Sequence, residues 1–143
     1  MQAIIMAAGK GTRMGELTKK TAKPLLLVNG KPIIEHILER LPLAVDHAIL
    51  VIGPFKEQFK ERLGEQFGRI KLSYVIHEKT AGTGAAVWDT QPHLESGKSF
   101  LILNGDDITS QEDLENLIQF PYALGLFKTK PEHQQRRSSK GEQ

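Results

Sequence analysis

The stretch that decides the fold is QAIIMAAGKGTRMG, residues 2–15. Its first part, residues 2–8, is short and almost wholly apolar, and glycines follow it at once. An apolar run of this length that stops at a glycine-rich turn predicts a strand buried on both faces. We therefore expect residues 2–8 to form the central strand of a sheet.

The second part of the same stretch predicts a phosphate-binding loop. Gly9, Gly11 and Gly15 have no side chains, so backbone N–H groups can approach an anion closely. Lys10 and Arg13 supply positive charge. The spacing does not fit the P-loop, and the third glycine comes one residue too late for the dinucleotide-binding fingerprint. A tight turn that binds no ligand is the alternative interpretation.

Elsewhere the chain alternates between apolar runs and amphipathic segments. Besides residues 2–8, the pattern predicts strands at residues 47–52, 70–76, 99–103 and 122–127, and helices at residues 31–41, 54–67 and 85–94 and after the capping residue Ser110. Apolar strands that alternate with helices are typical of a mostly parallel sheet. The expected fold is α/β, a three-layer Rossmann-like sheet with helices on both faces.

The composition is that of an ordinary globular domain. Of the 143 residues, 39% are hydrophobic and 25% are charged, which is enough apolar material for one core. No apolar run approaches the length of a membrane span and none resembles a secretory signal, so we expect a cytoplasmic protein with no membrane partner. Cysteine is absent, which excludes disulfides and thiolate metal sites.

The positive net charge comes from the C-terminal end. Residues 1–127 hold 14 Lys or Arg against 15 Asp or Glu, whereas residues 128–143 hold five basic residues against two acidic ones. Because residues 132–143 have no apolar side chain to bury, nothing offsets the entropy lost on ordering. We therefore predict a domain over residues 1–127 and a polar, basic, disordered tail over residues 128–143. Five charges without aromatic residues among them do not favour nucleic-acid binding.

Three unusual segments each follow a predicted strand. They are residues 7–15, 82–86 and 104–107. In an open parallel sheet, ligands bind beyond the carboxyl ends of the strands, where the loops converge. We therefore expect these three segments to face one ligand.

Three charged residues belong to the same edge, two of them within the segment 104–107. Lys23 precedes Pro24, which favours an extended backbone and fixes the direction of the lysine side chain, so Lys23 can reach a phosphate. Asp106 and Asp107 follow a predicted strand, where a carboxylate can hold a hard cation such as Mg²⁺ against phosphate oxygens. We assign the metal to Asp106. A solvated lysine and a turn aspartate are the alternatives.

Together these motifs resemble a known family, the nucleotidyltransferases that activate sugar 1-phosphates, among them glucose-1-phosphate thymidylyltransferases and uridylyltransferases. The matching segments are residues 7–14, 23–24, 30–33, 74–75, 82–86 and 104–106. Their order and spacing agree over residues 1–127, and the glycine loop with the Lys-Pro pair is the most specific part. The resemblance implies a nucleotide-diphospho-sugar transferase-like fold, of which this chain holds the N-terminal nucleotide-binding portion.

The resemblance also implies a Mg²⁺-dependent enzyme. In this family an oxygen of a sugar 1-phosphate attacks the α-phosphorus of a nucleoside triphosphate, here dTTP or UTP, and pyrophosphate leaves. Since one anion attacks another, such a reaction depends on positioning and on charge neutralisation rather than on covalent catalysis.

The same resemblance implies which residues contact the phosphates, the metal and the base. The phosphate contacts are the backbone amides of Gly9, Gly11 and Thr12, Arg13 at the pyrophosphate, Lys23 at the α-phosphate, and Asp106 through Mg²⁺. The residues that border the base are Ala7, Ala8, Gly82 and Thr83. His77 occupies the position of a common family glutamine that contacts the pyrimidine edge. Imidazole can both donate and accept there, depending on its tautomer.

Family catalytic domains continue past the end of this chain with a sugar-binding portion and a second acidic Mg²⁺ ligand. We therefore expect a truncated form, whose exposed sheet edge favours a homo-oligomer. A noncatalytic nucleotide-binding or assembly/regulatory protein is the alternative function. A dehydrogenase is disfavoured by the glycine spacing and by the second strand, which ends at Val51-Ile52-Gly53 with no acid to bind a ribose.

Overall fold

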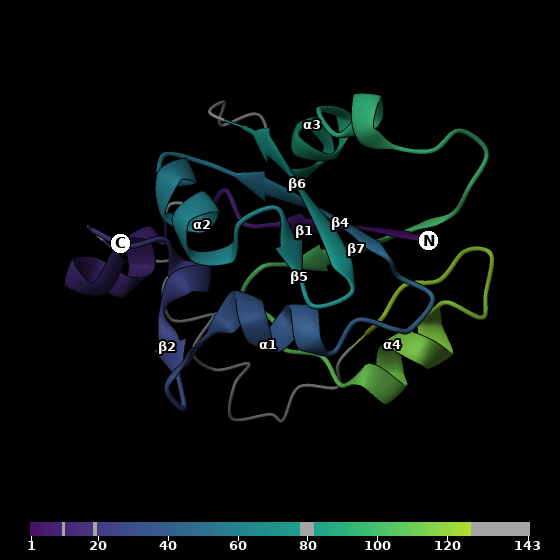
Figure 1. Cartoon of the computed structure of the whole chain (residues 1–143), viewed down its shortest axis with the longest axis horizontal. Helices are drawn as coiled ribbons and strands as arrows, with labels where there is room; N and C mark the ends of the chain where they lie inside the picture. The colour runs from purple at the N-terminus through teal and green to yellow at the C-terminus, as the bar shows by residue number, and fades with distance from the viewer. Residues whose placement is uncertain (10, 19, 78–81, 127–143) are drawn as a thin grey trace, which may run out of the picture.

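The computed structural model describes residues 1–9, 11–18, 20–77 and 82–126, with the backbone alone for residues 12–14. Figure 1 shows these residues as one sheet with helices packed against it. The predicted tail, residues 128–143, lies outside the described residues. Within the described part of the chain, no helix has both the length and the apolar character needed to cross a membrane.

A five-stranded sheet forms the centre of the structure, in the order β5-β6-β4-β1-β7. Its strands are β1 (Gln2–Met6), β4 (His47–Ile52), β5 (Gln66–Phe67), β6 (Ile70–Ile76) and β7 (Phe100–Asn104). All neighbours run parallel except β5, which pairs antiparallel with β6. Residues 2–8 do supply an interior strand, which pairs with β4 and β7 and ends at Met6, but the central position of the five belongs to β4.

Helices and short turns connect these strands. The α-helices are α1 (Ile33–Glu39), α2 (Lys56–Leu63), α3 (Thr83–Trp88) and α4 (Gln111–Leu117). The 3₁₀ segments are η1 (Thr12–Thr18), η2 (Lys23–Leu25) and η3 (Gln91–His93). A small separate hairpin consists of β2 (Leu27–Val28) and β3 (Lys31–Pro32).

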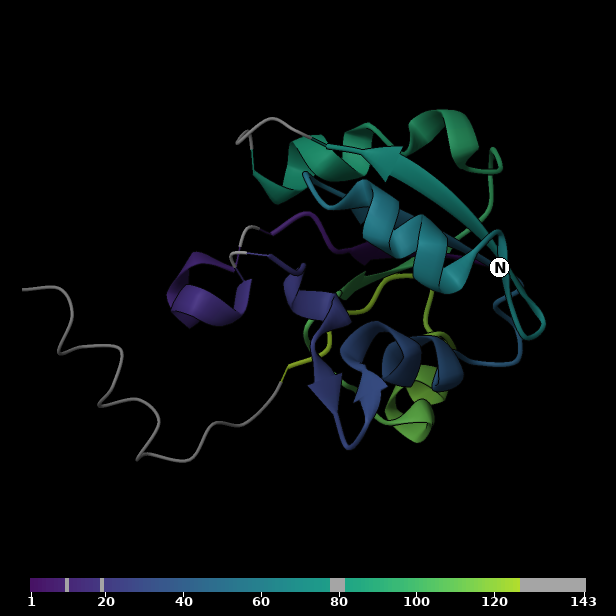
Figure 2. The same ribbon diagram turned by 60° about the vertical axis from the view of Figure 1, so that its left-hand side comes forward.

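The core has two parts because side chains of a strand alternate between the faces of the sheet. Ala3 and Ile5 of β1 belong to the larger cluster, which α1, α2 and α4 cover. Ile4 and Val51 point to the other face and pack against Ala86 of α3. In Figure 2, α3 accordingly lies across the sheet from α1 and α4. The predicted three layers are therefore present.

Several predicted helix boundaries shift by a few residues. The helix expected at residues 31–41 begins at Ile33, because residues 31–32 pair in β3. The helix expected at residues 54–67 ends before Gly64, whose φ of 64° breaks the helix, and the following residues turn back as β5. The helix expected at residues 85–94 is α3 followed by the separate turn η3.

The strand predicted at residues 122–127 is wrong over its described part, residues 122–126. These residues form no strand, and their described backbone groups make no hydrogen bond to β7. Tyr122 is 95% exposed and Leu124 is 80% exposed. An apolar run becomes a strand only where a neighbouring strand and a covering layer stabilise it, and among the described residues no strand pairs with residues 122–126.

A network of polar side chains lies at the amino ends of β1 and β4. The side-chain amide of Gln2 donates to Nδ1 of His47 at 3.0 Å and to the carbonyl of His93 at 2.7 Å. Since Nδ1 accepts, Nε2 of His47 carries the proton and donates to Ser73 Oγ at 2.9 Å. Burial, and to a smaller degree the charge of Lys71, lower the pKa of His47 from 6.5.

This network predicts that the protein loses stability on mild acidification. A folded-state pKa below the unfolded value means that the unfolded state binds the proton more readily. The contribution of neutral His47 is therefore fully present above about pH 6.5 and is lost as the pH falls toward the lowered folded pKa. Urea unfolding at a series of pH values measures this slope, and His47→Gln, which has no titratable ring, is the matched control. Parallel slopes in the two proteins would contradict the prediction.

Candidate functional site

The carboxyl ends of β1 and β7 lie side by side at the point where the chain changes from one side of β1 to the other. The strands β4 and β6 lie on one side of β1, and β7 lies on the other. In open parallel sheets this reversal point opens a crevice in which ligands bind. The loops after β1 and β7 therefore occupy the position expected of a ligand site.

Close backbone contacts hold these loops together. The amide of Gly105 donates to the carbonyl of Met6 at 2.9 Å. A Cβ atom at Gly105 would lie 2.9 Å from that carbonyl oxygen and 3.1 Å from Cα of Ala7, so only glycine allows this approach. The loop after β4 is similarly close, since a Cβ at Gly53 would lie 3.0 Å from the carbonyl oxygen of Ala8. The loops after β1, β4 and β7 thus converge on one edge. Two of them belong to the predicted segments 7–15 and 104–107, whereas the loop after β4 was not among the predicted three.

The glycine loop is fixed by a contact that the sequence did not reveal. Gly11 has a φ of 61°, and its carbonyl accepts a hydrogen bond of 2.7 Å from Oγ1 of Thr18. Thr18 is 5% exposed, and a Cβ at Gly11 would come within 2.8 Å of its methyl carbon. Gly9, in contrast, is exposed, and a Cβ atom added there would meet nothing within 4 Å. Thr18 therefore fixes the loop at Gly11, whereas the loop is exposed at Gly9.

Not every predicted phosphate contact can be placed. Thr12 and Arg13 begin η1, but only their backbone is described. Lys10 lies outside the described residues. The backbone course of η1 nevertheless returns the chain to the loop through Thr18.

Lys23 and Asp106, which are 83 positions apart in the sequence, form an ion pair between Nζ and Oδ2. The short η2 turn positions the lysine, and its Pro24 is buried. Asp106 directly follows Gly105, the residue that contacts β1. Both charged side chains are about one-third exposed, at 33% and 38%. The structure therefore brings together the two predicted charged residues at the edge of the sheet.

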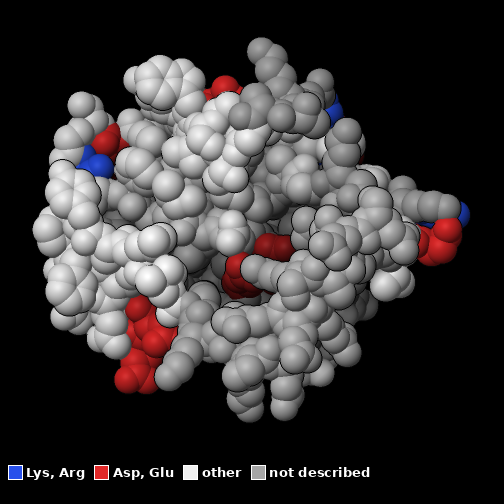
Figure 3. Space-filling view, turned by 180° about the vertical axis from the view of Figure 1, so that it is seen from behind, with Lys and Arg blue, Asp and Glu red and all other residues white. Residues whose placement is uncertain are grey.

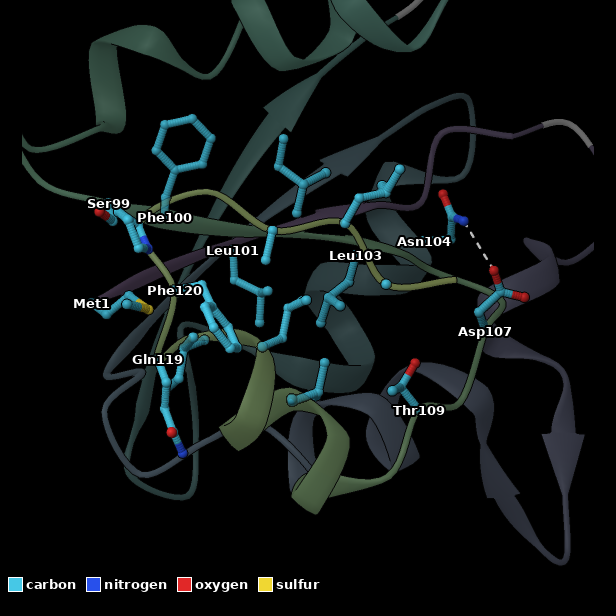
Figure 4. Close-up of a pocket in the computed structure, with 18 residues that line it drawn as sticks. Met1, Ser99, Phe100, Leu101, Leu103, Asn104, Asp107, Thr109, Gln119 and Phe120 are labelled. Carbon is cyan, nitrogen blue, oxygen red and sulfur yellow. Dashed lines mark hydrogen bonds between the residues drawn. The ribbon is translucent and has the colours of Figure 1, made fainter. Parts of the chain in front are cut away.

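Asp107 has a different partner from Asp106. Its Oδ2 accepts a hydrogen bond of 2.9 Å from the side-chain amide of Asn104, which is drawn as a dashed line in Figure 4. Among the described residues there is no group of three or more His, Cys, Asp or Glu that could hold a metal by itself. Any cation at this edge would therefore need ligand oxygens in addition to the carboxylate of Asp106.

A second group of predicted residues lies on the α3 face of the sheet. Ala8 packs in the same cluster as Ala86 of α3, whereas Ala7 is buried in the larger cluster on the other face. Gly82, with a φ of 86°, leads into α3, and Thr83 is the first residue of that helix. Residues 78–81 lie outside the described residues.

His77 is held at the end of β6 by an acid that the sequence did not single out. Its backbone amide donates to the carbonyl of Ile52 at 2.8 Å, and its Nδ1 lies 2.7 Å from Oδ2 of Asp89, at the end of α3. A carboxylate accepts, so Nδ1 of His77 carries the proton and Nε2 of the neutral ring is an acceptor. The Asp89 contact was not predictable, because it depends on how α3 packs on the sheet.

Comparison with known proteins gives matches over most of the chain. Residues 2–133 match the family model described as "Nucleotidyl transferase". The chain is similar to the "Bifunctional protein GlmU" of Methanococcus maripaludis (37% identical, covering 90% of this chain and 30% of the relative). It is also similar to the "UTP--glucose-1-phosphate uridylyltransferase AglF" of Haloferax volcanii (30% identical, covering 76% and 44%). The chain thus spans less than half the length of these curated relatives.

Solved structures show the same fold. A "UDP-glucose pyrophosphorylase complexed with UDP-glucose" superposes with a TM-score of 0.66 at 20% identity, over 82% of this chain and 53% of that one. "HddC from Yersinia pseudotuberculosis complexed with GMP-PN" superposes with a TM-score of 0.62 at 26% identity, over 73% and 47%. The Rossmann-like arrangement of strands and helices is therefore shared with larger proteins.

Proposed function

The chain belongs to the nucleotidyl transferase family, and on that basis we propose that it binds a nucleoside triphosphate with Mg²⁺ at the carboxyl ends of β1 and β7. The reaction we propose is transfer of the nucleoside monophosphate to a sugar 1-phosphate, with release of pyrophosphate. The observation that carries the proposal is the convergence of the open glycine loop with the Lys23–Asp106 pair at the reversal point of the sheet. A cytoplasmic location is part of the same proposal.

In this reaction the phosphate oxygen of the sugar 1-phosphate forms a bond to the α-phosphorus. The bond from the α-phosphorus to the bridging oxygen of the β-phosphate breaks, and that oxygen leaves with the pyrophosphate. The protein contributes by holding the two anions in line and by offsetting their charge. The amides of Gly9, Gly11 and Thr12 would hold phosphate oxygens, Arg13 the leaving pyrophosphate, and Lys23 the α-phosphate.

Asp106 is suited to Mg²⁺. This cation prefers hard oxygen ligands, keeps several waters, and is usually bound by one or two carboxylates together with substrate phosphates. An exposed carboxylate next to a phosphate loop, without a ready-made cage of protein ligands among the described residues, agrees with that preference. When bound, Mg²⁺ would neutralise the charge of the triphosphate, and Lys23, released from Asp106, would turn to the α-phosphate.

The base would lie on the α3 face, bordered by Ala8, Gly82 and Thr83. Ala7, which the sequence also assigned to the base, is buried on the other face of the sheet, so its side chain does not fit that role. His77 supports dTTP or UTP as the nucleotide. Its Nδ1 is occupied by Asp89, so Nε2 can accept a hydrogen bond from the ring N–H that thymine and uracil present. Asp89 acts only through His77, as a positioning residue.

Isothermal titration calorimetry of the chain with UTP or dTTP, with and without Mg²⁺, tests the binding proposal. We expect heat of binding that depends on Mg²⁺. Release of pyrophosphate in the presence of glucose 1-phosphate tests the enzyme separately. Binding without release from any common sugar 1-phosphate would favour the noncatalytic alternative, and absence of binding would refute the site.

Gly9→Ala is predicted to impair binding without unfolding the protein. A methyl group at Gly9 meets no protein atom within 4 Å, so stability should change by less than about 0.5 kcal/mol. The same methyl group would stand where a phosphate has to approach the amides, and affinity should fall about tenfold, or about 1.4 kcal/mol. Gly125→Ala, equally open but outside the loop, is the matched control. Equal affinities for the two variants in the calorimeter would contradict the prediction.

A further inference from the structure

The side chains of His77 and Asp89 are held against each other on the α3 face of the sheet, where the proposed base pocket lies. Nδ1 of His77 is 2.7 Å from Oδ2 of Asp89, and the histidine side chain is only 8% exposed. The backbone of His77 is fixed as well, because its amide donates to the carbonyl of Ile52. The imidazole ring therefore has little freedom to turn, and its second nitrogen, Nε2, has a fixed position.

Nε2 of His77 is the polar atom that this pair leaves for a ligand. Among the described residues, no hydrogen bond of the ring uses Nε2. In the same part of the chain, Gln58 Oε1 is the one buried side-chain nitrogen or oxygen without a partner, so Nε2 is not sealed from solvent. With the proton on Nδ1, Nε2 presents a lone pair and no hydrogen. It can accept a hydrogen bond but cannot donate one.

Asp89 is an unfavourable residue for its place in the helix. It is the C-cap of α3, where the free carbonyl groups disfavour a negative charge and favour a positive one. Figure 3 shows acidic surface at the top of the molecule, where α3 lies in Figure 1, apart from the acidic groups in the central hollow. The helix itself therefore does not account for an acid at this position, whereas the contact with His77 does.

We infer that Asp89 determines the base specificity of the site, as a positioning residue that fixes the tautomer of His77. The inference rests on the proposed function, because it takes His77 as the residue that meets the edge of the base. Uracil and thymine present a ring N–H at that edge, which Nε2 can accept. Cytosine presents a ring nitrogen without hydrogen, whose lone pair would face the lone pair of Nε2. A site built to pair with an N–H rejects the analogue that lacks it, so the pair selects uracil and thymine against cytosine.

UTP and CTP are the matched ligands for this inference, because they share the ribose, the triphosphate and the size of the base. In calorimetry with Mg²⁺, the affinity for UTP should exceed that for CTP by roughly 10- to 100-fold, the usual effect of leaving a buried hydrogen-bonding group unpaired. Asp89→Asn should bring the two affinities within about threefold of each other, by weakening UTP and strengthening CTP. An amide can either accept from Nδ1 or donate to it, so it no longer enforces one tautomer.

The tautomer itself can be measured in the free chain, with no nucleotide present. In long-range proton–nitrogen NMR spectra, a protonated ring nitrogen and an unprotonated one have well-separated nitrogen shifts. His77→Gln identifies the signals of this ring among those of the five histidines. We expect the proton on Nδ1 in the unmodified chain, and on Nε2 in a substantial fraction of the Asp89→Asn variant.

Glu95→Gln is the control for the loss of one negative charge. It removes an exposed carboxylate from an ion pair with Lys98 and should keep the preference for UTP. Circular dichroism and the melting temperature establish that each variant is folded. Equal affinities for UTP and CTP in the unmodified chain, a proton on Nε2 of its His77, or a preference that survives in Asp89→Asn would each overturn the inference while the binding site stands. Absence of binding of both nucleotides would instead refute the proposed function, and the inference with it.

Discussion

Lys23→Met is expected to weaken Mg²⁺-dependent binding of UTP or dTTP by roughly 10- to 100-fold, since a hydrogen bond to a charged group contributes about 1.5–3 kcal/mol. Methionine keeps most of the length of the side chain, with one heavy atom fewer, and removes the charge and the donors. In the structure, Lys23 reaches Asp106 at the carboxyl edge of the sheet, so its ammonium is already in the site before a ligand arrives. Calorimetry on the unmodified chain and the variant gives the ratio of affinities.

Asp106→Asn should change the metal dependence rather than the basal affinity. Asparagine cannot form the ion pair, so Lys23 is free for phosphate, and binding without Mg²⁺ should equal or exceed that of the unmodified chain. The increase in affinity on adding Mg²⁺ should be lost, because the charged ligand is gone. Lys98→Met, which removes an exposed lysine from an ion pair of 2.8 Å with Glu95, is the control. Lys98→Met serves as the control for Lys23→Met, because both variants remove one positive charge. If Lys98→Met weakens nucleotide binding as much as Lys23→Met does, the effect is one of net charge and the assigned role of Lys23 is wrong.

Gly105→Ala is expected to destabilise the fold by about 1–3 kcal/mol, the usual cost of forcing an extra carbon into a packed position. The added Cβ would lie 2.9 Å from the carbonyl oxygen of Met6 and 3.2 Å from Cβ of Ala7. Both atoms belong to the buried carboxyl end of β1, where Met6 pairs with β4 on one side and β7 on the other, so the backbone has little room to move. The strand ends must separate, which also moves Asp106 away from the glycine loop.

Urea unfolding measures this loss, and Gly84→Ala is its matched control. Gly84 lies within α3 with open space around it, so alanine there should stabilise the helix by about 0.5–1 kcal/mol. The same chemical change should therefore have opposite signs at the two positions. A Gly105→Ala variant as stable as the unmodified chain would show that β1 and β7 are less tightly joined than described.

Much of the fold was predictable from local pattern. Residues 2–8, 47–52 and 70–76 are apolar runs bounded by turn residues, and the strands they form are central or covered by helices, so pattern and environment agree. Ser110 was likewise predictable as a helix cap, and its Oγ accepts from the amide of Asp113 at 3.1 Å. Residues 122–126 have the same apolar pattern, but no partner strand among the described residues, and local sequence does not reveal whether a partner exists.

The candidate site was predictable in its parts and not in its contacts. The glycine loop, Lys23 and Asp106 stand out by residue type, and parallel-sheet topology places the segments at one edge. Thr18 behind Gly11 and Asp89 beside His77 were missed, because each contact depends on how a turn or a helix packs on the sheet. Such long-range pairings have no periodicity, and hence leave no signal in a single sequence.

The Lys23–Asp106 pair also has a consequence for the small ions that surround any protein in a cell. A resting site whose positive and negative charges cancel attracts neither orthophosphate nor free divalent cations strongly, since each would have to displace a partner that is already in contact. A nucleotide that arrives together with its cation supplies a replacement for both partners at once. The pair would thus select the complete complex over its more abundant components.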